Sequence, residues 1–197
     1  MGMQKIAEVI EASTTEFVAE CYELYGLPPL GALVKTSAVG VDIYGIVYNA
    51  TTASVEPGRR PIARGRDETS EEAVYQANPQ LAKLLRSEFR ALVVGHGKGT
   101  IVRHRLPPNP ARIHGFVHAC SSEEVKNFSA SLAFLNVLLN THVLVPFEEV
   151  TAAALRQMSE AHEEPERFLV AAGKELAVAL GSDYGRLRLI LDRIKST

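Results

Sequence analysis

The sequence predicts an α+β fold in which a small closed β-barrel precedes a C-terminal helical bundle. Short β-like runs separated by turn residues fill the first part of the chain and return before residue 120. After residue 120 the apolar residues recur at helical spacing instead. Hydrophobic residues make up 46% of the 197 positions and charged residues 22%, which is the composition of a chain that folds throughout.

The first strands are predicted from alternating apolar and polar residues. A polar turn at Ser13-Thr14-Thr15 predicts a hairpin between the first two runs, and Val39-Gly40 predicts a second turn. Gly45 inside the last run predicts a bulge or tight bend, as small barrels need at their corners. The runs are residues 6–10, 16–21, 30–34 and 41–48.

The middle of the chain predicts a helical excursion and then a return to strands. Residues 57–72 have the composition of a long exposed loop, and helical patterning follows over 70–76 and 79–86. We therefore expect a helical insertion around residues 70–87. Further strands are expected at 89–94, 100–106 and 113–120, with a turn at 95–99. The total of about six to seven strands suffices for a small barrel domain over residues 1–120.

Residues 121–197 predict the helical region. Ser121 and Glu124 have the spacing of a capping box, in which each side chain satisfies a free backbone N–H at a helix start. Pro165 suits a first helical turn and Gly181 a helix end. The later helices are predicted over residues 148–161, 165–180 and 183–194.

An apolar seam follows the capping box and supplies the candidate protein interface. Its spacing of three and four predicts one broad helical face, which is buried either between the barrel and other helices or in a subunit interface. The residues predicted at the interface are Phe128, Leu132, Phe134, Leu135 and Leu138.

The exposed loop supplies the candidate site for nucleic acid or phosphate. Arg59, Arg60, Arg64 and Arg66 place four guanidinium groups within eight residues, and such groups bind phosphate or an acidic surface. Acidic residues follow at 67, 68, 71 and 72, so a solvated, charge-balanced loop is the alternative interpretation.

Motifs for chemistry are incomplete, and we predict no catalytic residue, no metal site and no cofactor. The segment Gly95–Thr100 lacks the first glycine and the helix of a phosphate-binding loop, which favours a turn. His114 and His118 on one strand would lie roughly 13 Å apart, too far to share an ion. Cys21 and Cys120 are expected to be small buried residues rather than a disulfide.

Charge and hydropathy indicate a cytoplasmic protein. The formal net charge of −2 creates no general attraction to nucleic acid or to an anionic membrane. The longest apolar stretch, residues 132–139, is too short to cross a bilayer. Residues 1–10 contain Lys5 and Glu8 and lack the apolar core of a signal peptide.

Four segments together resemble a HAS-barrel, the barrel type of HerA ATPases and ATP synthase subunits. They comprise a first strand, a turn into a second, a Leu-Gly step and a Tyr-Gly-containing strand, at residues 6–10, 13–17, 30–34 and 43–47. The resemblance covers residues 4–55, and it implies a closed barrel that caps or connects an oligomeric ATPase ring and contacts a partner nuclease. Because no Walker motif follows, ATP hydrolysis is not implied. The chain is most similar to a stand-alone bacterial HAS-barrel protein with a helical tail.

Three hypotheses for function follow. The first is a non-enzymatic binding or assembly module that docks onto an ATPase, a nuclease or its own copies. The second is a nucleic-acid-binding barrel that uses the arginine loop, with Tyr44 and Tyr48 available for stacking on bases. The third is an enzyme around His114 and His118.

Overall fold

The computed structural model describes residues 5–141 and 146–195, which form seven strands and seven helices. The strands are β1 Lys5–Ala12, β2 Glu16–Cys21, β3 Leu33–Ala38, β4 Val41–Ser54, β5 Leu85–Lys98, β6 Ile101–Arg103 and β7 Phe116–Ala119. The helices are α1 Glu71–Ala77, α2 Leu81–Leu84, α3 Ser122–Ser129, α4 Phe134–Leu139, α5 Phe147–Ser159, α6 Pro165–Leu180 and α7 Tyr184–Lys195.

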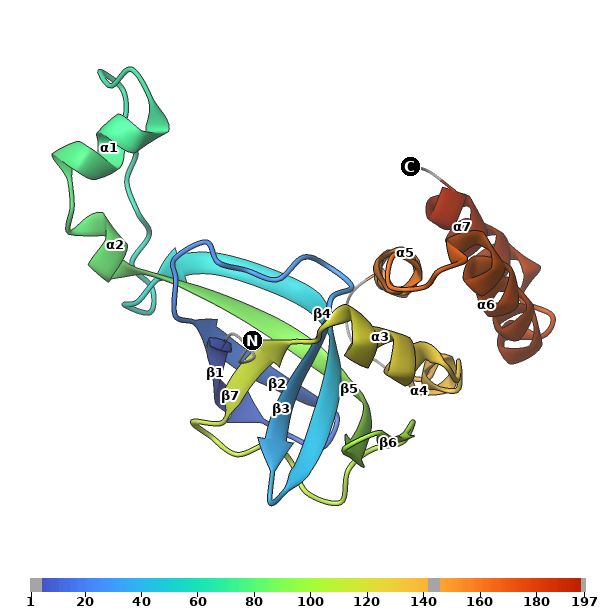
Figure 1. The fold of residues 1–197 in the computed structure, drawn as a ribbon. Coiled ribbons are helices and arrows are strands. Elements are labelled where there is room, and N and C mark those ends of the chain that lie inside the picture. The colour runs from blue at the N-terminus through green and yellow to red at the C-terminus, as the bar shows by residue number, and fades with distance from the viewer. Residues whose placement is uncertain (1–4, 142–145, 196–197) are drawn as a thin grey trace.

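Six of the strands close into an antiparallel barrel, as the sequence predicts. The order is β2-β1-β7-β3-β4-β5, and the pairing of β5 with β2 completes the ring. Strand β6 pairs with β5 and lies outside the ring as an extra strand. Helices follow at the C-terminus and lie to one side of the barrel (Figure 1), so the α+β prediction is confirmed.

Local turn chemistry forms the predicted hairpin and bulge. The Ser13 hydroxyl accepts hydrogen bonds from the backbone N–H groups of Thr15 and Glu16, at 3.2 and 3.0 Å, which closes the β1–β2 turn. The register between β4 and β5 shifts at Gly45. A Cβ there would lie 2.8 Å from the ring of buried Phe17, so this bend needs a residue without a side chain.

Two apolar clusters hold the fold together. The first fills the barrel interior and includes Phe17, Ile43, Val47 and Phe89. The second covers the outer face of β3, β4 and β5 and runs without interruption into α3–α7. Each fully buried large apolar side chain contributes about 1.5–3 kcal/mol of transfer free energy. The barrel and the C-terminal helices thus share a core, and together they are termed the body below.

Gly31 lies where helix α5 approaches the barrel most closely. Its φ is +85°, and a Cβ at this position would be 2.4 Å from the backbone nitrogen of Ala154. Only glycine has both the required conformation and the required space. The Leu30-Gly31 pair noted in the sequence therefore lies where the barrel contacts helix α5.

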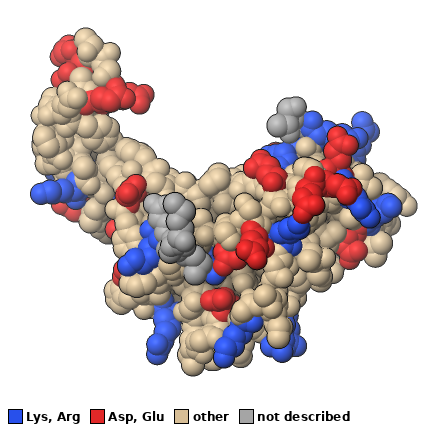
Figure 2. Space-filling view, in the orientation of Figure 1, with Lys and Arg blue, Asp and Glu red and all other residues tan. Residues whose placement is uncertain are grey.

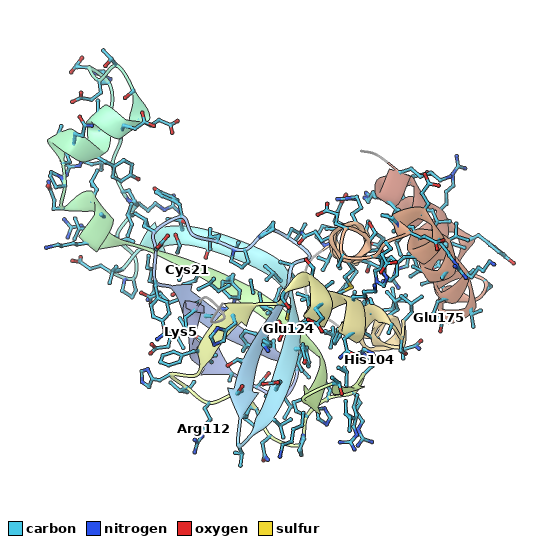
Figure 3. The ribbon with its side chains drawn as sticks, viewed as in Figure 1. Lys5, Cys21, His104, Arg112, Glu124 and Glu175 are labelled. Atoms are coloured by element: carbon cyan, nitrogen blue, oxygen red, sulfur yellow. The ribbon has the colours of Figure 1, made fainter. Side chains whose placement is uncertain are left out.

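A charged pair fixes the start of α3 against β3. The predicted capping box is present, because the Ser121 side chain accepts from the Glu124 N–H while the Glu124 carboxylate accepts from the Ser121 N–H at 2.9 Å. That carboxylate also accepts a hydrogen bond from the ammonium of buried Lys35. Glu124 lies at the barrel end of the helix (Figure 3).

Strands β4 and β5 extend beyond the barrel and carry the helical insertion as an arm. Residues 49–54 pair with residues 85–90, of which residues 88–90 also pair with β2, so the two strands are alone only over their last residues. Residues 55–84 follow and form the end of the arm with α1 and α2. None of residues 49–86, termed the arm below, is buried. Figure 1 shows this segment projecting away from the rest of the molecule.

Several predicted boundaries are wrong, and strand pairing explains the first two of those described here. The helix expected over 79–86 is one turn long, because Leu85 pairs with Ser54 and begins β5. The turn expected at 95–99 is confined to Gly99-Thr100, since His96 pairs with both Ile43 and Arg103 within the sheet. The strands expected over 30–34, 100–106 and 113–120 are Leu33–Ala38, Ile101–Arg103 and Phe116–Ala119.

The predicted helix ends in the C-terminal region are confirmed. Pro165 occupies the first turn of α6, and Gly181 ends it with a φ of +56°. Helix α7 is held to α5 by ion pairs, with Arg186 donating to Glu148 at 2.6 Å and Arg193 donating to Glu149. Within the described ranges, no helix has the length and apolar character needed to cross a membrane.

Candidate functional site

Three of the four predicted arginines meet at the foot of the arm. Arg59, Arg60 and Arg64 line a cavity of about 370 Å³ together with Lys83, beside the point where β4 ends and β5 begins. Arg66 lies further along the exposed loop and does not line this cavity. Only three of the four arginines that are close in sequence therefore line the same cavity.

The arginines of this cavity are already partly engaged. Arg59 donates to Glu56 at 3.0 Å, with both side chains about 60% exposed. Arg64 donates to the side-chain oxygen of Asn78 at 3.3 Å. Such exposed pairs contribute little stability and exchange easily with other anions. The cavity thus offers a loosely held cationic surface.

The residues predicted at a protein interface lie in the chain's own core. Phe128, Phe134, Leu135 and Leu138 are fully buried, and Leu132 is partly buried against them. The Phe128 ring lies 5.2 Å from Tyr44 on the barrel and 4.6 Å from His104, which Figure 3 labels beside α3 and α4. The apolar seam is therefore buried between the barrel and the other helices and not in a subunit interface. These side chains present no docking surface.

The histidines considered for chemistry have separate surroundings. His114 lies outside β7 with a φ of +65°, and its Nδ1 is 2.6 Å from a Glu8 carboxylate oxygen. His118 lies within β7, and its Nδ1 has no hydrogen-bond partner in the described structure. No group of three or more His, Cys, Asp or Glu residues suited to a metal was found in residues 5–141 and 146–195.

The two cysteines are free thiols. Burial raises the pKa of Cys120 to about 12, with the nearby Glu124 charge adding to the effect. Burial likewise raises the pKa of Cys21 to about 11. Because a thiolate is the nucleophilic form, neither cysteine is activated for attack at neutral pH.

A second cationic site, which the sequence reasoning missed, lies beside the β5–β6 hairpin at one end of the barrel and is termed the mouth below. Ile43 faces the barrel interior and pairs with His96, which pairs in turn with Arg103, so these side chains share the inner face. Lys98 and Ile101 continue the same face by strand alternation. The mouth lies at the end that carries the β3–β4 and β5–β6 turns.

The mouth is a cavity of about 620 Å³ with an aliphatic lining and a cationic rim. Ile101 and Leu106 are 63% and 43% exposed there. The rim consists of Lys98, Arg103 and Arg105, which form no ion pair with any residue in the described ranges. Figure 2 shows lysine and arginine side chains along this lower end of the barrel.

The sequence carried a signal for this site. Between Phe89 and Ser122 there is no aspartate or glutamate, whereas five lysines or arginines occur there. The formal net charge of the whole chain, −2, conceals this local excess. A charge count along the chain would have found the mouth.

The fold and these sites define an α+β barrel protein with two cationic cavities, one at the foot of the arm and one at the barrel mouth. Comparison with protein-family models finds no match to this chain. A search of curated proteins also finds no match.

Proposed function

We propose that this chain is a non-enzymatic binding or assembly module that contacts other proteins through its arm. The observation that carries the proposal is that none of residues 49–86 is buried. Ile62 is 71% exposed, Val55 44% and Leu84 39%. A segment of this length that builds no core of its own gains stability by covering its apolar groups against another surface.

The body supports the same function by holding the arm in a defined direction. The arm begins and ends in β4 and β5, whose paired residues continue into the closed barrel. Tyr25, in the loop after β2, donates its backbone N–H to Ser87 at 2.9 Å and packs its ring edge-on against Tyr75 of α1. The arm is therefore presented from a rigid base, as an interaction element requires.

The resemblance to HAS-barrels suggests the kind of partner. In that interpretation the barrel connects to an ATPase ring or a nuclease in the bacterial cytoplasm, or to further copies of this chain. The contacts between β3–β5 and the C-terminal helices favour the arm and the barrel ends as the available surfaces, because the helices cover one barrel face.

The test compares the full chain with a chain whose residues 57–82 are replaced by Asn-Gly, a turn that suits the end of a two-stranded ribbon. We expect the shortened chain to keep the far-ultraviolet circular dichroism of the barrel and helices and to lose association, measured as native mass by light scattering. Equal association by both chains would contradict the proposal.

The second candidate is nucleic-acid binding at the foot of the arm, favoured by the cavity that Arg59, Arg60 and Arg64 line. Tyr44 and Tyr48 are 3% and 7% exposed, so neither is available to stack on a base. Binding would rest on phosphate contacts and weaken steeply with salt. Arg59→Ala/Arg60→Ala should then abolish the anisotropy change of a labelled oligonucleotide, and retained binding would exclude this site.

A further inference from the structure

The end of the arm carries an acidic cluster that is separate from the arginines at its foot. Asp67, Glu68, Glu71 and Glu72 lie in the loop before α1 and in its first turn, and all are exposed. Hydrogen bonds from its own backbone and from Ser70 lower the pKa of Glu72, which keeps its charge at neutral pH. Figure 2 shows carboxylates gathered at the far end of the arm. These four residues are termed the acidic tip below.

The cationic mouth and the acidic tip lie at opposite ends of the same two strands. Val41 and Lys98 are at the mouth end of β4 and β5, whereas Ser54 and Leu85 are at the arm end. Each strand has 14 residues and therefore spans roughly 40 Å or more. The arm continues away from the barrel in Figure 1, so the acidic tip of a chain cannot reach its own mouth.

The mouth is positively charged and the acidic tip is negatively charged. The rim of the mouth holds Lys98, Arg103 and Arg105 without ion pairs in the described structure, around an aliphatic lining. The acidic tip supplies four carboxylates on a slender projection with small neighbours such as Ala73. The mouth has a volume of about 620 Å³, and its three cations are exposed, so carboxylates on a projecting segment can approach them from solvent.

We propose that the acidic tip of one copy binds the cationic barrel mouth of a second copy. The inference rests on the proposed function, and it names both the partner and the surface that receives the arm. Each copy then offers one tip and one mouth. Because the contact joins two different surfaces, it is a head-to-tail contact. Such contacts continue from copy to copy and end in a closed ring or an open filament.

The mouth lacks features expected of a single-stranded nucleic-acid site. Its lining contains Ile101, Leu106 and Pro108 in place of the aromatic side chains on which bases stack. The nearest carboxylate along β4 is Asp42, which accepts from the Ser37 hydroxyl at 2.8 Å and so is engaged elsewhere. A protein segment that carries carboxylates and small apolar residues suits the cationic rim and aliphatic lining of the mouth better than a nucleic acid does.

The decisive experiment uses two full-length variants that each neutralise one surface. The tip variant carries Asp67→Asn, Glu68→Gln, Glu71→Gln and Glu72→Gln. The mouth variant carries Lys98→Gln, Arg103→Gln and Arg105→Gln. A control variant carries Arg167→Gln, Lys174→Gln and Arg188→Gln on exposed parts of α6 and α7. Circular dichroism verifies that all of them fold.

We expect the wild type and the control to form assemblies larger than a dimer in light scattering. Each surface variant alone should be monomeric, with the dissociation constant raised about tenfold or more. Mixed in equal amounts, the two should form a dimer and nothing larger, because the mixture contains one intact tip and one intact mouth per pair. Salt near 1 M, where the Debye length is ~3 Å, should dissolve the assemblies.

Other outcomes overturn the inference in distinguishable ways. Loss of association on shortening the arm, with full association by the mouth variant, would refute the mouth as the receiving surface while the proposed function stands. A monomeric wild type that binds a labelled oligonucleotide, with binding lost in the mouth variant, would assign the mouth to nucleic acid instead. Equal association by all the chains, including the shortened one, would contradict both proposals.

Discussion

The body and the arm of this protein differ in what holds their residues in place. In the body, two apolar clusters, paired strands and the Lys35–Glu124 contact fix each element against several others. In the arm, paired backbone and exposed side chains define the structure, and no residue from 49 to 86 is buried. A residue type that stabilises the fold in the body should therefore contribute little stability in the arm, and matched substitutions can measure this.

The largest expected difference concerns an apolar side chain. Phe128→Ala removes a fully buried ring that contacts Tyr44, His104 and the α4 phenylalanine, and should lower the free energy of unfolding by about 3–5 kcal/mol. Ile62→Ala in the arm removes a side chain that is 71% exposed and should change it by less than about 0.5 kcal/mol. Urea unfolding followed by circular dichroism measures both. Similar losses of unfolding free energy for the two variants would contradict the proposed difference between body and arm.

The second comparison uses two glycines with positive φ. Gly31→Ala in the body places a Cβ 2.4 Å from the α5 backbone and should cost about 2–4 kcal/mol. Gly58→Ala in the arm has a φ of +81° but no atom within 4 Å of the new Cβ, so it should cost only the conformational strain of about 1–2 kcal/mol. The same unfolding experiment applies, and a harmless Gly31→Ala would show that α5 does not pack against the barrel as described.

The third comparison concerns ion pairs and pH. Burial raises the Glu124 pKa, but the hydrogen bonds from Lys35 and Ser121 and the charge of Lys35 together outweigh it, so the net pKa lies below the usual 4.5. A lowered carboxyl pKa stabilises the fold above the unfolded value, and the contribution is lost as the pH falls through the lower folded value. Glu124→Gln should therefore cost about 1–2 kcal/mol at pH 7 and progressively less below pH 4.5.

The matched control for this pair is Glu56→Gln in the arm. Its partner Arg59 is 65% exposed, and a pair so open to solvent contributes little to stability. Unfolding midpoints of Glu56→Gln should follow the wild type at every pH between 3 and 8. If the Glu124→Gln variant also followed the wild type, the Lys35 contact would be structurally unimportant.

Local signals explain the parts of the fold that the sequence predicted well. The Ser13 turn, the Ser121–Glu124 capping box and the Gly181 helix end all depend on residues close together in the chain. Each has a short-range physical cause, a capping hydrogen bond or a glycine conformation, so pattern alone was enough.

Long-range contacts explain the errors. Glycines at 95, 97 and 99 predicted a turn, but Gly97 serves a close approach, since a Cβ there would lie 2.1 Å from the Ile101 carbonyl oxygen. Helical spacing identified an apolar face at Phe128 and Leu135 without showing that the chain's own barrel covers it. The mouth is lined by residues between His96 and Pro108 and by Val41 of β4, which the pairing of β4 with β5 brings beside them.

Hydrogen–deuterium exchange of dilute wild-type protein tests the contrast between body and arm most directly. We expect amides of α1 to exchange through local opening, orders of magnitude faster than those of β4 residues 43–48 and of α5, which exchange only on global unfolding. Protection of α1 equal to that of the barrel strands would contradict this expectation, because the arm would then belong to the cooperative core.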